Sequence, residues 1–193
     1  MRDLDRVLSI SVMALMGAGF AIAPANAAKP IEQLTAFAVD MSNMSGGART
    51  GTVDITIDRW TSDEERDRLR AALQEGGSDG LLRALQKEKE VGRIRSTGSI
   101  GYPLRFAREI PISTGGRRIL LGTDRFVSFL ERTNPGPASQ YPFMVIDIRL
   151  NAKGEGEGKL LPLAKVTMDE DHVVEIENYA SEPVRLTSVR KLK

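Results

Sequence analysis

From position 53 to position 65 the chain reads Val53-Asp54-Ile55-Thr56-Ile57-Asp58-Arg59-Trp60-Thr61-Ser62-Asp63-Glu64-Glu65. The first half alternates apolar and polar residues, which is typical of a β-strand with one buried face and one face in water. The alternation then stops at Thr61 and Ser62, which cap helix N-termini, and the three acids that follow suit the first turn of a helix. The stretch therefore predicts a strand that leads directly into a helix.

The predicted helix is short and is followed by a second one. Gly76-Gly77 ends the first helix, and Ser78 or Asp79 starts the second. The apolar residues expected to face inward from the two helices are Leu69, Ala72, Leu73, Leu81, Leu82 and Leu85. We expect a helical hairpin that lies on a sheet.

Strands are predicted on both sides of this hairpin. One runs from Leu34 to Met41 and pairs with the strand at Val53, and beyond Glu90 every periodic segment is a strand. These later strands are predicted at 102–112, 117–123, 143–150, 160–168, 173–179 and 184–189. Their short connections favour antiparallel pairing. The fold class is α+β: a strand-dominated antiparallel sheet, a sandwich or partly open barrel, with a helical hairpin inserted after the second strand.

Composition excludes several classes of protein. The chain has 193 residues, 27 basic and 26 acidic side chains, one histidine and no cysteine. A net charge of +1 argues against nucleic-acid binding, and 41% apolar residues argue against disorder. Without cysteine the chain forms no disulfide, zinc-thiolate site or iron–sulfur cluster.

The first 27 residues have the pattern of a secretory signal peptide. An apolar run from Val7 to Ala23 follows Arg2 and Arg6, and Ala25-Asn26-Ala27 fits a cleavage site. We expect export to the periplasm or the extracellular space, with residues 28–193 forming a single mature domain. No later segment is long and apolar enough to cross a membrane as a helix. An uncleaved anchor is the alternative.

One motif resembles a hydrolase site. Gly76-Gly77-Ser78-Asp79-Gly80 matches G-x-S-x-G, and Asp147 and His172 follow in the order of α/β-hydrolases. However, a nucleophile elbow requires a strand before the serine, and here a helix precedes it. Helix capping explains the pentapeptide, so no catalytic residue is assigned.

Two other segments suggest ligand sites but fit them poorly. The glycine-rich run Lys153–Lys159 lacks the spacing and the Ser or Thr of a phosphate loop, so a flexible hairpin loop is predicted. The second segment groups side chains that can bind a metal: Asp169-Glu170-Asp171-His172, followed by Glu175 and Glu177. It lacks the spacing of a calcium loop. A solvated turn accounts for it, and neither a metal nor a cofactor is predicted.

The arginines form the most informative charge pattern. Residues 93–132 contain eight arginines and three acids, whereas residues 147–182 contain nine acids and four bases. We predict a ligand-binding set on the arginine-bearing strands and nearby aromatics: Arg95, Arg105, Arg108, Tyr102 and Trp60. Ion pairing between the basic and acidic strands is the structural alternative, and Trp60 also suits packing of the helix on the sheet. Arg108 shares its strand parity with apolar Phe106 and Ile110, so it requires an interior ion pair, a bulge or an anionic ligand.

Several stretches together resemble a family of uncharacterised secreted bacterial proteins. They are Gly51-Thr52-Val53, Arg59–Leu69, Gly98–Tyr102, Arg117–Arg125 and Glu177-Asn178-Tyr179-Ala180. The resemblance covers nearly all of residues 28–193 and implies an exported single domain. It implies no activity and no site residues.

These observations favour an exported, non-catalytic binding protein for an anionic or amphipathic ligand of the cell envelope. A small secreted hydrolase that uses His172 is an alternative, and a structural protein that pairs through a strand edge is another. Convergence of His172, Asp147 and a hydroxyl in one pocket would favour the hydrolase.

Overall fold

The computed structural model describes residues 29–41, 48–113, 115–124, 143–169, 174–178 and 183–192, so the predicted signal peptide at 1–27 lies outside the described residues. The described elements are β1 (Glu32–Asp40), β2 (Arg49–Ile57), α1 (Asp63–Lys87), β3 (Gly92–Ser96), β4 (Tyr102–Leu104), β5 (Phe106–Pro111), β6 (Arg117–Thr123), β7 (Phe143–Leu150), β8 (Glu155–Met168), β9 (Val174–Asn178) and β10 (Val184–Lys191). The predicted α+β class is confirmed.

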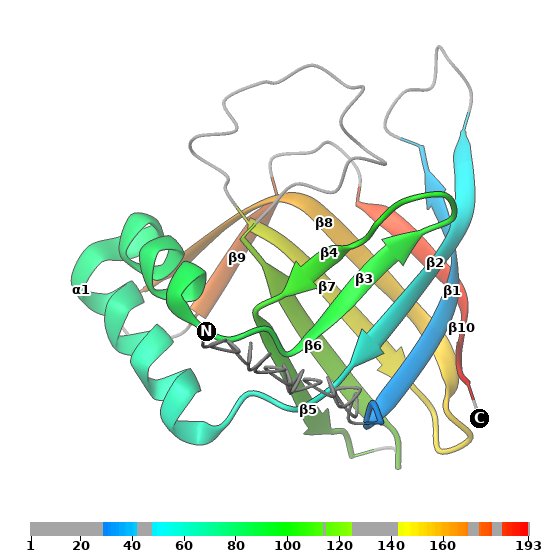
Figure 1. Ribbon diagram of the computed structural model, residues 1–193, viewed down its shortest axis with the longest axis horizontal. Helices are drawn as coiled ribbons and strands as arrows, with labels where there is room; N and C mark the ends of the chain where they lie inside the picture. Colours follow the sequence, from blue (N-terminus) through cyan, green and yellow to red (C-terminus); the bar gives the residue numbers. More distant parts are fainter. Residues whose placement is uncertain are drawn as a thin grey trace, which may run out of the picture.

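All the strands belong to one curled antiparallel sheet (Figure 1). Its order is β4-β3-β2-β1-β10-β8-β7-β6-β5, and β9 pairs with β8 outside this path. The two ends of the path are consecutive in the chain, since β5 follows β4 after Arg105 alone. The Arg105 N–H donates to the Gly122 carbonyl on β6 at 2.9 Å. Among the described strands, however, no ladder joins β4 to β5 or β6, so the sheet is curled like a partly open barrel and is not closed into a complete one.

A first hydrophobic cluster fills the inside of the curl. Alternate residues of β1, β2, β6 and β7 face it, as the period of a half-buried strand predicts. On β1 and β2 these residues include Leu34, Ala36, Val53, Ile55 and Ile57, all buried. Trp60 and Tyr102 pack against the same cluster while remaining partly exposed.

A second cluster lies between α1 and the outer face of the sheet, where α1 packs on β8 (Figure 1). Leu69, Leu73 and Leu85 of α1 are buried there. Strand β7 contributes to both clusters, so four consecutive residues, 143–146, are buried. A strand covered on both faces reads as a continuous apolar run and loses its alternation.

The strand predicted at 102–112 is interrupted at Arg105. Leu104 and Ala107 both face the inner cluster, although their spacing would place them on opposite faces of a continuous strand. Phe106 consequently faces the second cluster, and Ile110 is exposed. The prediction of one continuous strand at 102–112, with Phe106 and Ile110 on the same apolar face, is therefore wrong.

The flexible loop predicted at Lys153–Lys159 is also corrected. The turn ends at Gly154, and β8 begins at Glu155. Gly156 pairs with Leu150 of β7, and a Cβ on Gly156 would lie 1.8 Å from the Arg149 carbonyl oxygen. The glycines allow close approach of two strands, which is the usual meaning of glycine inside a strand.

Candidate ligand-binding site

The start of α1 is fixed by a capping box and an ion pair. The Glu65 N–H donates to the Ser62 hydroxyl at 3.2 Å, and the Glu65 carboxylate accepts from the Ser62 N–H at 2.8 Å. Arg59 donates to the same carboxylate at 2.7 Å. This hydrogen bond from Arg59 holds the pKa of Glu65 below its ordinary value, against the opposing effect of burial.

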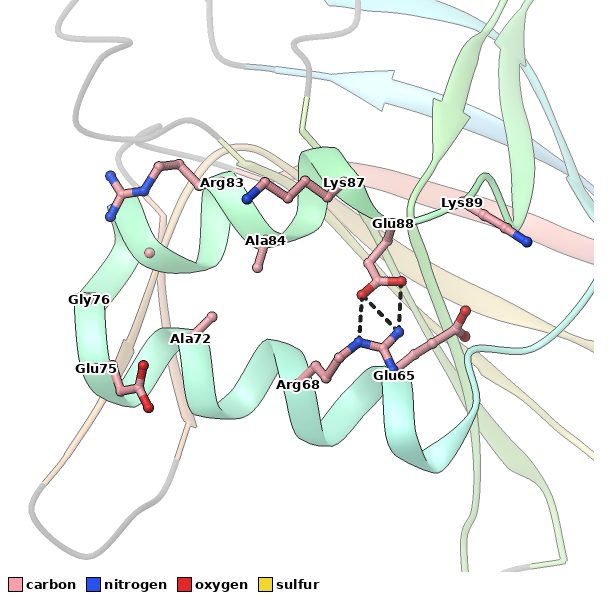
Figure 2. A pocket seen from close by; sticks show the side chains of 11 residues that line it. Glu65, Arg68, Ala72, Glu75, Gly76, Arg83, Ala84, Lys87, Glu88 and Lys89 are labelled. Carbon is pink, nitrogen blue, oxygen red and sulfur yellow. Dashed lines mark hydrogen bonds and ion pairs between the residues drawn. The ribbon is translucent and has the colours of Figure 1, made fainter.

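The element α1 is the predicted helical hairpin. Gly77 has φ 58° and ψ −152°, a conformation that interrupts the helix and that glycine adopts at little cost. The two arms run side by side (Figure 2), and a Cβ on Gly80 would lie 2.4 Å from the Ala72 carbonyl oxygen. The Ser78 hydroxyl, close to the turn, donates to the Val166 carbonyl of β8 at 2.7 Å. The tip of the hairpin is thereby attached to the sheet.

An apolar pocket of about 430 Å³ lies between this hairpin and the outer face of the sheet. Both arms of α1 and strands β5 to β9 contribute to its wall. Its apolar lining is Leu69, Leu73, Leu81, Leu85, Phe106, Leu120, Leu121, Phe143, Met144, Val145, Val166, Val174 and Ile176. Gly122 also lines the pocket, and a Cβ there would meet only the Phe106 Cβ, at 3.4 Å. The volume is within the range of roughly 300–1,000 Å³ that small-molecule pockets occupy.

The charged residues in the described lining of this pocket are Arg66 and Arg70, and no acid lines it. They lie one helical turn apart on the first arm of α1. Arg66 pairs with Asp63 at 3.1 Å and with Asp67 at 2.8 Å. Asp63 also accepts from Arg108 at 2.9 Å. The pocket therefore joins an apolar wall to a rim of arginines.

A second, polar groove of about 860 Å³ lies between the two arms of α1 (Figure 2). Small residues such as Ala72 and Ala84 line it, and Arg68 reaches across to Glu88 with nitrogen–oxygen distances of 3.1–3.3 Å. Ion pairs within the protein thus occupy Arg68, Glu88 and Glu65 at this end of the groove. Most of the residues that line the groove are charged.

The five residues that the sequence predicted as a ligand set make contacts within the protein. Arg95 is exposed on β3 and pairs with Asp54 of β2 at 3.2 Å. Arg105 donates to the Glu88 carbonyl at 2.9 Å, and its Nε lies 3.9 Å from a buried Asp124 oxygen, beyond hydrogen-bond distance. Tyr102 and Trp60 pack on the inner cluster. None of the five lines the apolar pocket, and their role with a ligand stays a prediction.

Arg108 is paired, as the sequence required, but at the surface. It donates to the Thr61 carbonyl at 3.1 Å and to Asp63 at 2.9 Å, and the Asp63 side chain is 67% exposed. Of the three alternatives that the sequence offered, the interior ion pair is therefore wrong. The interruption at Arg105 turns Ala107 inward, and Arg108 contacts the first turn of α1.

The residues of the hydrolase-like motif serve other interactions. The Ser78 hydroxyl is bound to Val166, and the Asp147 carboxylate accepts two hydrogen bonds from Arg118, at 2.8 and 3.0 Å. The Arg118–Asp147 pair joins β6, which lies in the arginine-rich stretch, to β7, where the acidic stretch begins. His172 lies outside the described residues. Within those residues, no group of three or more acidic, histidine or cysteine side chains is placed to hold a metal ion.

Sequence reasoning missed the pocket and its rim. The leucines of α1 were identified as packing residues, and Arg66 and Arg70 belong to an ordinary solvated helix face. One signal was present: residues 143–146 are apolar without alternation, which indicates a strand covered on both faces. It pointed to a second apolar layer outside the sheet.

The chain has no match among the protein-family models, the curated proteins or the solved structures with which it was compared. The resemblance to secreted bacterial proteins therefore stays a prediction. In the described part of the chain, no helix is long and apolar enough to cross a membrane.

Proposed function

We propose that the protein is an exported, non-catalytic binding protein that holds an apolar or amphipathic small molecule between α1 and the sheet. The observation that carries this proposal is the apolar pocket of about 430 Å³ under the helical hairpin. Enclosed apolar pockets with few charged groups are the usual form of small-molecule sites.

The pocket is suited to an exchangeable ligand. Its wall combines two helical arms with five strands, and the arms are joined to each other by a glycine turn at Gly77. The pocket opens to solvent, and its volume and apolar lining match those of small-molecule sites. Binding of a ligand would account for both.

The test uses the neutral fluorescent probe N-phenyl-1-naphthylamine and purified protein. We expect saturable fluorescence enhancement in the wild type and at least tenfold weaker binding in Gly122→Leu, because the added side chain enters the pocket. Thr52→Leu on the exposed face of β2 is the matched control and should bind like the wild type. Equal binding by all three proteins would overturn the proposal.

A second measurement identifies the natural ligand. Native mass spectrometry of protein purified from the exporting host should show a bound small molecule, and Gly122→Leu should reduce its occupancy. The hydrolase alternative has no supporting contact among the described residues and is not proposed.

A further inference from the structure

We propose that the pocket under α1 selects uncharged apolar molecules over anions, and that the Arg66–Asp67 ion pair contributes to this selection. This inference rests on the proposed function, and the experiment below separates the failure of one from the failure of the other.

The guanidinium group of Arg66 is already engaged by acids of the same helical arm. Its Nε and Nη2 donate to one oxygen of Asp67 at 3.0 and 2.8 Å, and its Nη1 lies 3.1 Å from an oxygen of Asp63. All three nitrogens therefore face carboxylates of the protein. Both acids are held beside Arg66 by the helix itself, so a ligand carboxylate would have to displace one of them to bind this arginine.

The rest of the described lining offers no better partner for a charge. Arg70 also has an interaction partner within the protein. The other described residues of the lining are apolar side chains and Gly122. A charged group that leaves water for such surroundings without a partner is strongly disfavoured. An anion is therefore not compensated in this pocket.

An uncharged ligand avoids this cost and keeps the full contact with the apolar wall. Its burial removes apolar surface of both ligand and protein from water, which is the main favourable contribution at such a site. Arg66 and Arg70 can extend their apolar stems over the end of the ligand while their charged groups stay in water. The Arg66 side chain is 42% exposed, which agrees with this arrangement.

The experiment measures displacement of the neutral probe N-phenyl-1-naphthylamine from the purified protein by 1-dodecanol and by dodecanoate, at neutral pH and low salt. The two competitors share one chain and differ in the charge of the end group. We expect dodecanol to displace the probe at about tenfold lower concentration than dodecanoate, because the carboxylate finds no partner in the pocket.

Asp67→Asn tests the part played by the ion pair, because it removes the acid that holds two of the three guanidinium nitrogens of Arg66. Asp67 is 62% exposed and lies outside the lining, so the wall of the pocket should be retained. We expect dodecanoate to displace the probe about threefold better from this variant than from the wild type, and dodecanol to act equally on both. Since the same two compounds are compared on both proteins, the difference in their solubility cancels.

Two further variants show where any gain comes from. Asp54→Asn is the matched control, because it removes an exposed acid that pairs with Arg95 outside the pocket, and it should leave the preference for dodecanol unchanged. Adding Arg66→Met to Asp67→Asn should abolish the gain in dodecanoate binding, because the released guanidinium group is then absent. Unchanged affinity for the neutral probe shows that each variant retains the pocket.

Equal displacement by dodecanoate and dodecanol in the wild type would overturn the inference, because the pocket would then accept a charged end group. An unchanged preference in Asp67→Asn would overturn the part assigned to the ion pair. Both results leave the proposed function intact, whereas absence of probe binding to the wild type overturns the proposed function itself.

Discussion

Glu32, the first residue of β1, has a buried carboxylate. Replacing it with glutamine tests how much this carboxylate stabilises the fold. Its side chain is 3% exposed and accepts from Arg117 at 2.9 and 3.2 Å and from Lys191 at 3.2 Å. Arg117 lies on β6 and Lys191 on β10. The cluster therefore joins β1 to its neighbour β10 and to β6, which is four places from β1 along the path. Burial lowers the pKa of Arg117, yet its hydrogen bonds to Glu32 and Glu109 outweigh this effect and raise that pKa overall.

Removing one partner of a buried ion pair costs about 3–5 kcal/mol, because the other charge is left uncompensated. In Glu32→Gln, Arg117 keeps its bond to Glu109 at 2.9 Å, and Lys191 is half exposed. We therefore expect the free energy of unfolding to fall by about 3 kcal/mol, near the lower end of this range. The free energy of unfolding falls by about 2 kcal/mol for each molar of urea, so the urea midpoint of unfolding should fall by about 1.5 M.

Urea unfolding followed by tryptophan fluorescence measures this shift, since Trp60 packs on the inner cluster. Asp54→Asn is the matched control, because Asp54 is 40% exposed and its pair with Arg95 should contribute at most about 1 kcal/mol. If Glu32→Gln lowers the free energy of unfolding no more than Asp54→Asn does, the reasoning from burial is refuted.

Three further predictions concern other parts of the fold. Arg108→Met should lower the free energy of urea unfolding by only about 0.5–1 kcal/mol, as expected for an exposed ion pair. A loss above about 3 kcal/mol would show that the Arg108 pair behaves as a buried one. Gly156→Ala should lower the free energy of unfolding by about 2 kcal/mol or more because its Cβ meets a carbonyl oxygen. Gly76→Ala is the control and should not, because its Cβ would meet only the end of the Arg83 side chain at 3.6 Å; equal effects would contradict the close approach of the strands. Glu65 has a lowered folded-state pKa, so its bond to Arg59 stabilises the fold above its ordinary pKa of 4.5, and this contribution is lost as the pH falls through the folded pKa. Glu65→Gln should flatten the acid limb of stability against pH, and an unchanged limb would contradict that assignment.

The elements predicted well from the sequence are those determined by local pattern. The alternation at Val53–Ile57 requires only one wet face, and Ser62 with Glu65 forms a capping box within four residues. The hairpin turn at Gly76-Gly77 depends on the conformation of one glycine. These features were predictable because the interactions that determine them lie within a few residues along the chain.

The errors have a common physical origin in contacts between distant segments. The interruption at Arg105 is fixed by the Gly122 carbonyl on β6 and by the Glu88 carbonyl after α1, neither of which the local periodicity shows. Once that interruption reverses the faces of β5, the surroundings of Arg108 change with it. The pocket joins residues from 66 to 176, so its existence depends on the complete order of strands.

The arginines that the sequence marked for a ligand help to explain why the pocket stays open. Arg108 holds the first turn of α1 through Asp63, Arg105 holds the last residues through the Glu88 carbonyl, and Ser78 attaches the tip to β8. The height of the hairpin above the sheet is therefore determined by polar contacts at its base and tip. A hairpin held by apolar contacts alone would settle until its leucines filled the space, because interiors pack to high density. The charge pattern of the sequence would thus bear on the proposed ligand binding indirectly: the arginines hold the hairpin in place, and the pocket between the fixed points is the space that the proposed ligand would occupy.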